Sequence, residues 1–511
     1  MSLGLLGSAL VAIAIGVLAL RVLWPARVVW RPYRWLALSL GVGTGLGLTT
    51  VLLFGWLVLV GVPGPGLIAL EVALLAVLAI AAARRGRHQV PVGPPESADA
   101  SDRAPGTRVI GVAFMVTLVC AAGAFTGLSA AAPHGGWDAW MNWNLRARLI
   151  FRAGPEWRDA FSPLLAWSHP DYPLLVQGSI VRAWIYQGGE TLAGPVGVAL
   201  LFTGATVALL TTGVAAFRGR GQAMLAGLVL LATPFFIFHG ASQYGDVPVG
   251  FFFLATLVLL GLHERHKEHT DRFALLAGLT AGLAAWTKNE GLLFVAALAV
   301  AAVLTRRNRR ELRTFALGLL PMLVVIALFK LVLAPSNDLM SAMGSGTLIG
   351  RATDPHRYAL VARAFVEGIM GFGVNGLVSG VWLLVAYGLC VWRRSNAADA
   401  PWFRLAAATL VVMLLGHAAV FVLTAPDVAR LLNSSLERLL LQLWPAALLV
   451  YFLGVATPEE AAAELAEPRE LRAPETEKQA APQGGFGRIA GGVGGEPAML
   501  RARMDDPHQQ P

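Results

Sequence analysis

A polar segment between two apolar runs holds the side chains best suited to chemistry. The stretch GGWDAWMNWNLRARLIF at residues 135–151 places Asp138 between Trp137 and Trp140. A carboxylate beside tryptophans at a membrane is costly unless it is paired with a cation or used in a reaction. Because an ionised carboxylate can take a proton from a hydroxyl group, Asp138 is a candidate general base.

The tryptophans of this stretch have a second interpretation. Trp137, Trp140 and Trp143 are spaced three residues apart, which is typical of one face of a helix. Such a helix is expected to lie in the membrane interface, with its indoles at headgroup depth. Interfacial anchoring explains the aromatic side chains, whereas it leaves the carboxylate of Asp138 unexplained.

A second polar stretch, WSHPDYPLL at residues 167–175, presents His169, Asp171 and Tyr172 among two prolines. Proline disfavours a helix and restricts the residue before it, so a rigid extended turn is predicted. Such a turn suits the binding of a substrate or a metal ion. The alternative is a loop that closes onto the next helix, with Asp171 as a cap.

Two further motifs place a charge at the end of an apolar run. Asp246 in YGDVPVGF stands at the start of one run, where helix capping, worth about 0.3–1 kcal/mol, would alone account for it. Arg438 in SSLERLLLQLWP stands at the depth of a lipid phosphate. It is expected either to bind that phosphate or to extend its side chain along the apolar surface into the interface.

Lys288 and Glu290 lie in the motif TKNEGLL between two apolar runs. A charge at membrane depth costs about 2.5–3.5 kcal/mol on insertion, and a lysine beside a glutamate is the expected compensation. The two residues therefore form either a structural ion pair or part of a binding site. In the second case Lys288 meets a phosphate as a point charge, and Glu290 is its partner or a metal ligand.

The sequence offers His169, Asp171 and Glu290 as ligands for a divalent metal ion, because imidazole nitrogen and carboxylate oxygen suit such ions. A general base and a cation that binds phosphate do not require a metal ion to act. Cys120 and Cys390 both lie within apolar runs, which excludes a disulfide framework and a metal cluster built on cysteines.

The elements that must position these residues are membrane helices. Hydrophobic residues make up 56% of the 511 residues and charged residues 14%, against about 25% charged in soluble proteins. Runs of roughly 17 or more apolar residues can cross a hydrocarbon core of about 30 Å. With two shorter runs at 273–286 and 292–304, they predict an all-α polytopic membrane protein of about 13 transmembrane helices (11–14). The longer runs are 3–20, 36–62, 67–83, 109–132, 190–217, 221–238, 247–262, 314–334, 376–392, 405–424 and 439–456.

Basic residues mark alternate connections between these runs, which the positive-inside rule assigns to the cytoplasm. The polar motifs then lie on the extracytoplasmic face of an inner or plasma membrane, with the N-terminus outside and the C-terminus in the cytoplasm. The net charge of +9 reports this topology rather than nucleic-acid binding. The long outer loop nevertheless carries several arginines, for which an anionic ligand is one explanation: Arg146, Arg148, Arg152, Arg158 and Arg182.

Composition divides the chain into four parts. Residues 1–88 form an N-terminal leader of three spans, and residues 89–108 form a flexible cytoplasmic linker rich in Pro, Ser and Asp. Residues 109–456 hold the polar motifs and most of the spans. Residues 457–511 are expected to be a disordered cytoplasmic tail, because they contain too little apolar surface to fold alone.

The order of the motifs resembles the GT-C superfamily of polytopic membrane glycosyltransferases, which includes protein O-mannosyltransferases and aminoarabinose lipid A transferases. The resemblance runs from about residue 109 to 456. It rests on WDAW in the first large outer loop, HPDYPLL before the next span, YGDVPVGF, WTKNEGLL and, near the end, SSLERLLLQLWP.

The resemblance implies a hexosyl or pentosyl transferase that takes a sugar from a polyprenyl-phosphate donor on the extracytoplasmic face. In such enzymes an acidic residue of the first outer loop is the general base or positions the acceptor. By motif this residue is Asp138, with Asp246 as the second acidic position and Lys288 as the holder of the donor phosphate. The family often shows two adjacent acidic residues in this loop, whereas Ala139 follows Asp138 here, which argues against a paired metal site.

His169, Asp171, Tyr172, Glu290 and Arg438 complete the predicted donor or substrate site. The expected partners are the lipid-linked donor and membrane lipid, and the sequence does not specify an oligomeric state. A catalytically silent scaffold with a GT-C-like body remains open because the second adjacent acid is missing, and so do two other functions. A transporter or flippase of a lipid-linked or anionic substrate would line a path with charges through several spans. A polymerase or ligase of surface polysaccharide would use a similar outer site on a different fold.

Overall fold

The computed structural model describes residues 2–86, 105–268, 270–336, 345–373, 379–391, 395–424, 427–457 and 460. Their backbone is mainly helical, and the prediction of an all-α polytopic membrane protein is confirmed. Within these residues, nine helices are long and apolar enough to cross a membrane. They are α1 (Leu3–Leu23), α2 (Arg34–Val60), α3 (Gly66–Gly86), α4 (Pro105–Ala131), α7 (Ala193–Arg218), α10 (Asp246–His266), α13 (Arg309–Val332), α18 (Pro401–Thr424) and α19 (Val428–Gly454).

A tenth span arises if α8 (Arg220–Leu231) and α9 (Pro234–Ala241) are counted as one helix bent by 63°. The bend falls at Pro234, whose ring cannot continue the helix before it. Three apolar helices are shorter: α11 (Arg272–Thr287), α12 (Asn289–Leu304) and α17 (Gly380–Val391). Each predicted run thus has a helix, but the count of 13 spans is not confirmed, because four of the runs form short or broken helices.

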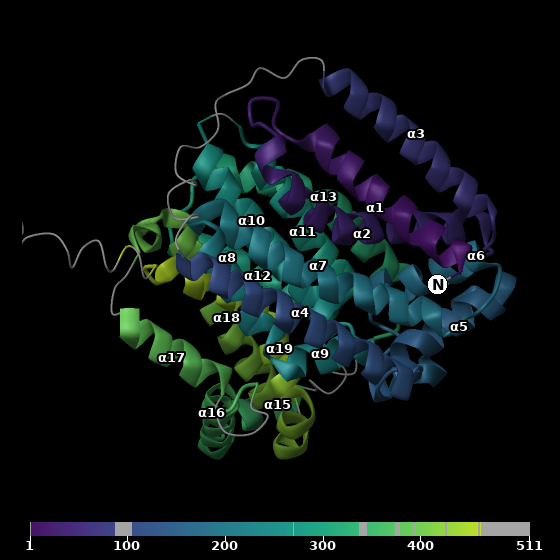
Figure 1. Ribbon diagram of the computed structural model, residues 1–511. Coiled ribbons are helices and arrows are strands. Elements are labelled where there is room, and N and C mark those ends of the chain that lie inside the picture. Colours follow the sequence, from purple (N-terminus) through teal and green to yellow (C-terminus); the bar gives the residue numbers. More distant parts are fainter. Residues whose placement is uncertain are drawn as a thin grey trace, which may run out of the picture. The chain divides into compact units, whose positions relative to one another are not determined.

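Helix α10 lies at the centre of the fold and packs against α7, α11 and α19 (Figure 1). The apolar part of α10 is entirely buried, including Phe251, Phe252 and Phe253. A helix that is apolar all round is expected in such a central position. Asp246 is the first residue of α10, so the burial of this helix buries the carboxylate as well.

The leader helices pack tightly with one another and with the rest of the chain. A Cβ atom built on Gly16 of α1 would lie 2.0 Å from the carbonyl oxygen of Gly41, and one on Gly45 of α2 would lie 1.9 Å from that of Ala12. Small residues at these positions let α1 and α2 approach closely, as membrane helices commonly do. Helix α1 also packs against α3, and both α1 and α2 contact α6 (Leu175–Gln187).

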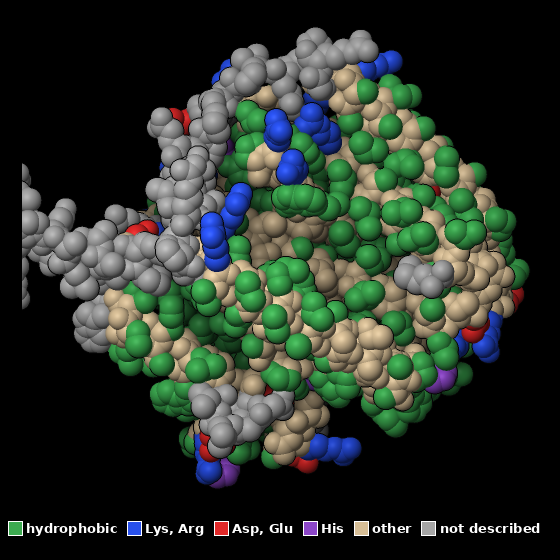
Figure 2. Space-filling view, viewed as in Figure 1, with side chains coloured by type: hydrophobic (Ala, Val, Ile, Leu, Met, Phe, Trp, Pro, Cys, Tyr) green, Lys and Arg blue, Asp and Glu red, His purple; other side chains and the backbone are tan. Residues whose placement is uncertain are grey.

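The described part of residues 1–461 forms one compact unit that includes the leader. Most of the predicted linker lies outside the described residues, although α4 already begins at Pro105. The predicted tail also lies outside them, apart from Thr457 and Glu460. Figure 2 shows hydrophobic side chains over much of one face of the molecule, with few charged ones between them, as expected for a surface in contact with lipid.

Short helices form the connections between the long helices, including residues 133–174, which keep the name outer loop from the predicted topology. In the outer loop a π-helical turn (Ala139–Trp143) leads into α5 (Asn144–Arg152), which is followed by two 3-10 helices (Gly154–Phe161 and Pro163–Ser168). Other short elements are the 3-10 helices Arg31–Tyr33 and Asn396–Asp399 and the helices α15 (Ser345–Ala352) and α16 (Pro355–Met370). The loop carries Asp138, and α6 follows it directly.

Candidate functional site

Four segments that are distant in sequence bring their charged residues together. Asp138 comes from the outer loop, Asp246 from the first residue of α10, Lys288 from the break between α11 and α12, and Arg438 from α19. All four were predicted as site residues, and they form one connected network. A second charged group, which includes Glu264, lies near the other end of α10, so the predicted site occupies one end of this helix only.

The break between α11 and α12 depends on local backbone chemistry. Lys288 is extended, with φ −149° and ψ 161°, and separates the two helices. A Cβ atom on Gly291 would lie 2.1 Å from the carbonyl oxygen of Ala284, so only glycine lets α12 begin this close to the end of α11. The break lets the buried side chain of Lys288 reach the N-terminal end of α10, where it contacts Asp246.

Asp246 is the fully buried centre of the network. Its Oδ1 atom accepts hydrogen bonds from Lys288 Nζ at 2.9 Å and Gln442 Nε2 at 2.7 Å, and its Oδ2 atom accepts from Arg438 Nε at 3.1 Å. Both oxygens are therefore occupied by donors from the chain. Asp246 organises the two cations, and its geometry leaves little capacity to take a proton or bind a metal.

Arg438 joins Asp246 to Asp138. Its NH2 atom lies 2.6 Å from Asp138 Oδ2 and 3.0 Å from Asp246 Oδ2, and its guanidinium stacks on Tyr244 at 4.8 Å. The side chain of Asp138 is 28% exposed, whereas that of Asp246 is 0% exposed. Asp138 is therefore the carboxylate of this pair that an incoming molecule can reach. Burial raises the pKa of Tyr244, so its hydroxyl remains protonated beside the site.

Glu290 pairs with the other cation of the network. Its Oε1 atom lies 2.8 Å from Lys288 Nζ, while its buried Oε2 atom has no hydrogen-bond partner among the described residues. Lys288 also faces the ring of Tyr172 at 5.8 Å. Burial raises the pKa of Tyr172, so the ring stands over the lysine as a neutral phenol.

The network contains three carboxylates, Asp138, Asp246 and Glu290, against two cations, Lys288 and Arg438. One negative charge is therefore in excess by formal count. Buried ion pairs are stable only while each charge stays compensated. An anion that enters here must accordingly take a cation away from a carboxylate, and Asp138, at the exposed edge, is the one most easily separated.

The predicted turn after the outer loop lies beside this network. Tyr172 stacks on Trp143, at 5.4 Å and 8°, and on His169, at 5.3 Å and 24°. Asp171 is buried and accepts a hydrogen bond at Oδ2 from Asn289 Nδ2 at 2.7 Å. Asp171 therefore does not cap the following helix, and its role is to connect the turn to the α11–α12 break.

The described residues contain no group of three or more His, Cys, Asp or Glu side chains arranged for a metal ion. The three metal candidates are used differently: His169 stacks on Tyr172, Asp171 is bonded to Asn289, and Glu290 is paired with Lys288. Because these side chains are held apart by other partners, they do not fit a metal centre.

The outer-loop helix departs from the interfacial arrangement expected of it. Trp137 and Trp140 are 60% and 44% exposed, as an interfacial anchor would be, but Trp143 is fully buried in the aromatic stack. The π-helical turn changes the period of the helix, so the three-residue spacing does not keep all three indoles on one face.

The arginines of the outer loop are largely bound by the chain itself rather than left for an anionic ligand. Buried Arg146 donates to the carbonyl oxygens of Ser168 at 2.6 Å and His169 at 2.9 Å, which fixes the predicted turn. Burial lowers the pKa of Arg146 to about 10, against the opposing effect of Asp171, and leaves it charged at neutral pH. The others have similar explanations: Arg148 and Arg152 pair with Glu190, Arg158 stacks on Trp157, and Arg182 pairs with Glu71.

Sequence reasoning missed Lys330, which lies in the last turn of α13. Its Nζ atom donates to the carbonyl oxygen of Asp171 at 2.5 Å and to Asn289 Oδ1 at 2.8 Å. The signal was present, because an ionisable residue inside an apolar run is a candidate site residue by default. Glu71 in α3 is an ionisable residue inside an apolar run as well, and it was also missed.

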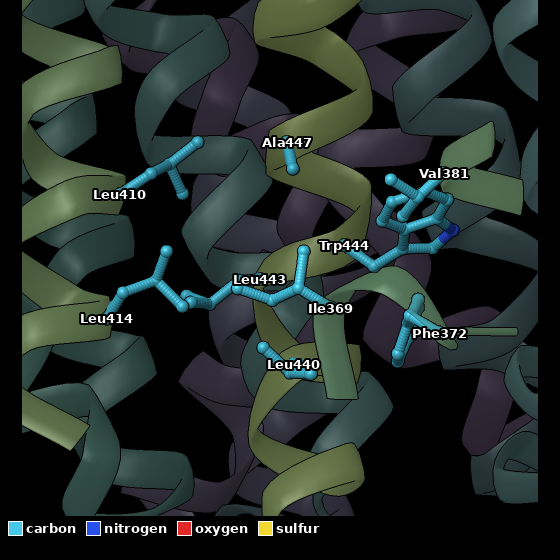
Figure 3. A pocket seen from close by; sticks show the side chains of 9 residues that line it. All are labelled: Ile369, Phe372, Val381, Leu410, Leu414, Leu440, Leu443, Trp444 and Ala447. Atoms are coloured by element: carbon cyan, nitrogen blue, oxygen red, sulfur yellow. The ribbon is translucent and has the colours of Figure 1, made fainter. Parts of the chain in front are cut away.

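An apolar cavity of about 140 Å³ lies between α16, α17, α18 and α19 (Figure 3). Its walls on α19 include Leu440, Leu443 and Trp444. With 3.6 residues per turn, these side chains point away from the face that carries Arg438 and Gln442. The cavity is therefore separated from the charged network by α19 and is not part of the site.

Residues 173–334 match the family model of dolichyl-phosphate-mannose-protein mannosyltransferases. The matched segment runs from the turn before α6 to the end of α13 and contains Asp246, Lys288 and Glu290. No curated protein and no solved structure matches the chain. The expectation of a GT-C-type membrane glycosyltransferase is confirmed over this segment.

Proposed function

We propose that this GT-C-type chain transfers a sugar from a polyprenyl-phosphate donor to an acceptor hydroxyl on the extracytoplasmic face of the membrane. The observation that carries the proposal is the difference between two linked carboxylates. Asp246 is sealed and saturated with donors, whereas Asp138 is held by Arg438 at the exposed edge. One carboxylate thus organises the cations, and the other lies at the edge where an acceptor can reach it.

Asp138 acts as the general base in this proposal. It takes the proton of the acceptor hydroxyl while that oxygen attacks the anomeric carbon of the donor. The bond between the anomeric carbon and the phosphate oxygen breaks, and the phosphate leaves with the electron pair. Arg438 and Lys288 stabilise the negative charge that develops on this phosphate, and their ion pairs with Asp246 keep both cations at this end of α10 before the donor binds.

The excess negative charge of the network gives the donor a second effect. A donor phosphate competes for the NH2 atom of Arg438, which now holds Asp138 Oδ2 at 2.6 Å. Asp246 retains Lys288 and Gln442 when Arg438 turns to the phosphate. Donor binding therefore releases Asp138 for the acceptor, and departure of the phosphate restores the resting ion pair.

The arrangement of charge along α10 favours transfer over transport. The charged network lies at the N-terminal end of α10, and the buried stretch 251–262 that follows is apolar apart from Thr256 and begins with Phe251, Phe252 and Phe253. A transporter or flippase would need polar groups through this central depth. A surface-polysaccharide polymerase or ligase remains the second transferase candidate, and it would use the same donor class.

Turnover of a lipid-linked sugar tests the proposal directly. Wild type, Asp138→Asn and Asp427→Asn are purified as full chains in nanodiscs, and release of polyprenyl phosphate from a polyprenyl-phosphate sugar is measured. Asp427 is the exposed cap of α19 and serves as the matched control, because asparagine also caps helices well. Loss of a general base predicts a decrease of about 10²–10⁴-fold in Asp138→Asn alone. Equal turnover in all three would refute the role of Asp138.

The sidedness of the site has its own test. We place the N-terminus outside and the C-terminus in the cytoplasm of an inner or plasma membrane, because the basic connections alternate along the chain. Ser168 is only 1% exposed, so a cysteine probe belongs at Leu164, which is 88% exposed. In a Cys120→Ala, Cys390→Ala background, Leu164→Cys is expected to react with an impermeant maleimide from outside and Arg309→Cys only after permeabilisation. The reverse pattern would invert the topology.

A further inference from the structure

A closed ring of hydrogen bonds lies next to the charged network. Lys330 Nζ donates to the carbonyl oxygen of Asp171 at 2.5 Å and to Asn289 Oδ1 at 2.8 Å, and Asn289 Nδ2 donates to Asp171 Oδ2 at 2.7 Å. The three residues come from the end of α13, the start of α12 and the turn before α6. The ring therefore ties three elements together at one point.

Each of two ring members neighbours a residue of the site. Asn289 stands in the chain between Lys288 and Glu290, and Asp171 precedes Tyr172, whose ring covers Lys288. A shift of either segment would change the distance between the lysine and its aromatic cover. Misplacement of reacting groups by about 1 Å can cost on the order of a hundredfold in rate.

The chemistry of lysine suits this position. The ammonium group has three donors and no acceptor, and here two donors meet oxygens of the ring while the third side faces Asp171 Oδ2 at 3.8 Å. The neighbours of Lys330 in the sequence are Phe329 and Leu331, so a charge at this point is costly unless it is bound. The hydrogen bonds of the ring offset the energetic cost of placing the lysine charge here.

We propose that Lys330 is a positioning residue, which locks the turn at Asp171 and Tyr172 onto Asn289 and thereby fixes the place of Lys288. The catalytic consequence rests on the proposed sugar transfer, whereas the structural consequence does not. Lys330 acts through Asp171 and Asn289 rather than by contact with the donor.

Hydrogen exchange of the full chain in nanodiscs tests the structural part without any substrate. The amides of His169 and Tyr172 are hydrogen-bonded within the turn, and their exchange reports its order. Lys330→Met is expected to speed this exchange at least about tenfold. Lys330→Arg should retain slow exchange, because it can reach the same oxygens. Arg152→Met is the matched control, since Arg152 is an exposed cation of the same loop that binds Glu190 instead.

Asn289→Leu breaks the same ring while it keeps the lysine charge. It is expected to match Lys330→Met in exchange, and the double variant should add little to either single change. In the transfer assay, both single variants should lower kcat by about tenfold to a hundredfold, with partial rescue in Lys330→Arg. Loss of kcat with unchanged exchange would overturn the inference, because Lys330 would then contact substrate. If wild type transfers no sugar, the proposed function fails while the exchange result still decides this inference.

Discussion

Two arginines of the chain, Arg182 and Arg438, pair with carboxylates in different ways. Arg182 binds a single carboxylate: its Nε lies 2.5 Å from Glu71 Oε1 and its NH2 2.7 Å from Glu71 Oε2. Ser8 accepts two further bonds, and the side chains of Arg182 and Glu71 are 1% and 0% exposed. Arg438 instead divides its donors between two carboxylates and is 21% exposed.

The difference indicates that the pair of Arg182 is structural, whereas the network of Arg438 is suited to binding a ligand. Arg182 on α6 holds Glu71 of α3 and Ser8 of α1, so its pair joins the leader to the helix that follows the outer loop. The network is closed, because the hydroxyl of Tyr186 also donates to Glu71. Arg438 belongs to a network with excess negative charge and an exposed edge. A ligand can exchange with a partner only in the second network.

The largest expected effect comes from breaking the closed pair. Glu71→Ala leaves the guanidinium of Arg182 buried without its carboxylate, which is expected to cost about 3–5 kcal/mol of stability. The measurement is the unfolding of the purified protein in detergent. The double variant Glu71→Leu, Arg182→Met removes both charges and should recover most of the loss. A cost below about 1 kcal/mol for the single variant would contradict a structural role for the pair.

Breaking the open pair should affect turnover more than stability. In the proposed mechanism, Arg438→Met removes a cation from the leaving phosphate, for which we expect a decrease of about 10²–10³-fold in transfer. Asp246 keeps Lys288 and Gln442, so the unfolding midpoint should change less than in Glu71→Ala. Arg438→Lys is the control, because a lysine keeps the charge but cannot reproduce the geometry of the guanidinium. Full activity in Arg438→Met would show that the open pair is structural as well.

A finer test concerns the aromatic support under Arg438. Tyr244→Phe keeps the ring, which lies 4.8 Å from the guanidinium, and removes only the hydroxyl near the Asp138 amide. Transfer is expected to fall by less than about tenfold, since a cation–π contact at a partly exposed site is worth about 0.5–1 kcal/mol and is retained here. Tyr244→Ala removes the ring and should lower kcat further. Equal effects of the two changes would mean that the hydroxyl, not the ring, supports Arg438.

The smallest effect is expected at the exposed pair of Arg152 and Glu190. The hydrogen bond from Arg152 lowers the pKa of Glu190, so the pair stabilises the fold at neutral pH. That contribution is lost as the pH falls below the ordinary glutamate pKa of about 4.3 and through the lowered value. Arg152→Met should therefore leave the unfolding midpoint nearly unchanged at pH 7, and its difference from wild type should vanish in acid. A large change in the unfolding midpoint at pH 7 would show that this exposed pair is structurally important, as the pair of Arg182 and Glu71 is expected to be.

Much of the site was predictable because each motif carries its own signal. Asp138 among tryptophans, Lys288 beside Glu290 and Asp246 before an apolar run all stand out as charges near a membrane. The pairing of these residues was not predictable, since it depends on how α10, α11 and α19 pack. Arg438 was expected to meet a lipid phosphate or to extend its side chain into the interface, whereas in the resting protein its partners are two carboxylates.

Two charges inside apolar runs, Glu71 and Lys330, were absorbed into predicted spans because the runs around them are long and apolar. Glu71 pairs with Arg182, 111 residues away, and Lys330 binds Asp171 and Asn289, 159 and 41 residues away, so nothing local indicates these partners. Trp143 shows the opposite limit: its three-residue spacing predicts a continuous helix, and a π-helical turn redirects the side chain. The spacing of apolar residues and their hydropathy predict helices, whereas a local change from α-helical to π-helical geometry depends on tertiary packing.

The contact between Asp138 and Arg438 also sets a schedule for biosynthesis, because the two residues are 300 positions apart. At about 5–20 residues per second, a ribosome needs roughly 15–60 s to reach the arginine after it has added the aspartate. During that interval the nascent chain already has its first outer loop but not the helix that completes the ion pair. If the proposed site is right, the chain becomes competent for transfer only when its last span enters the membrane, and a chain released before that moment is inactive.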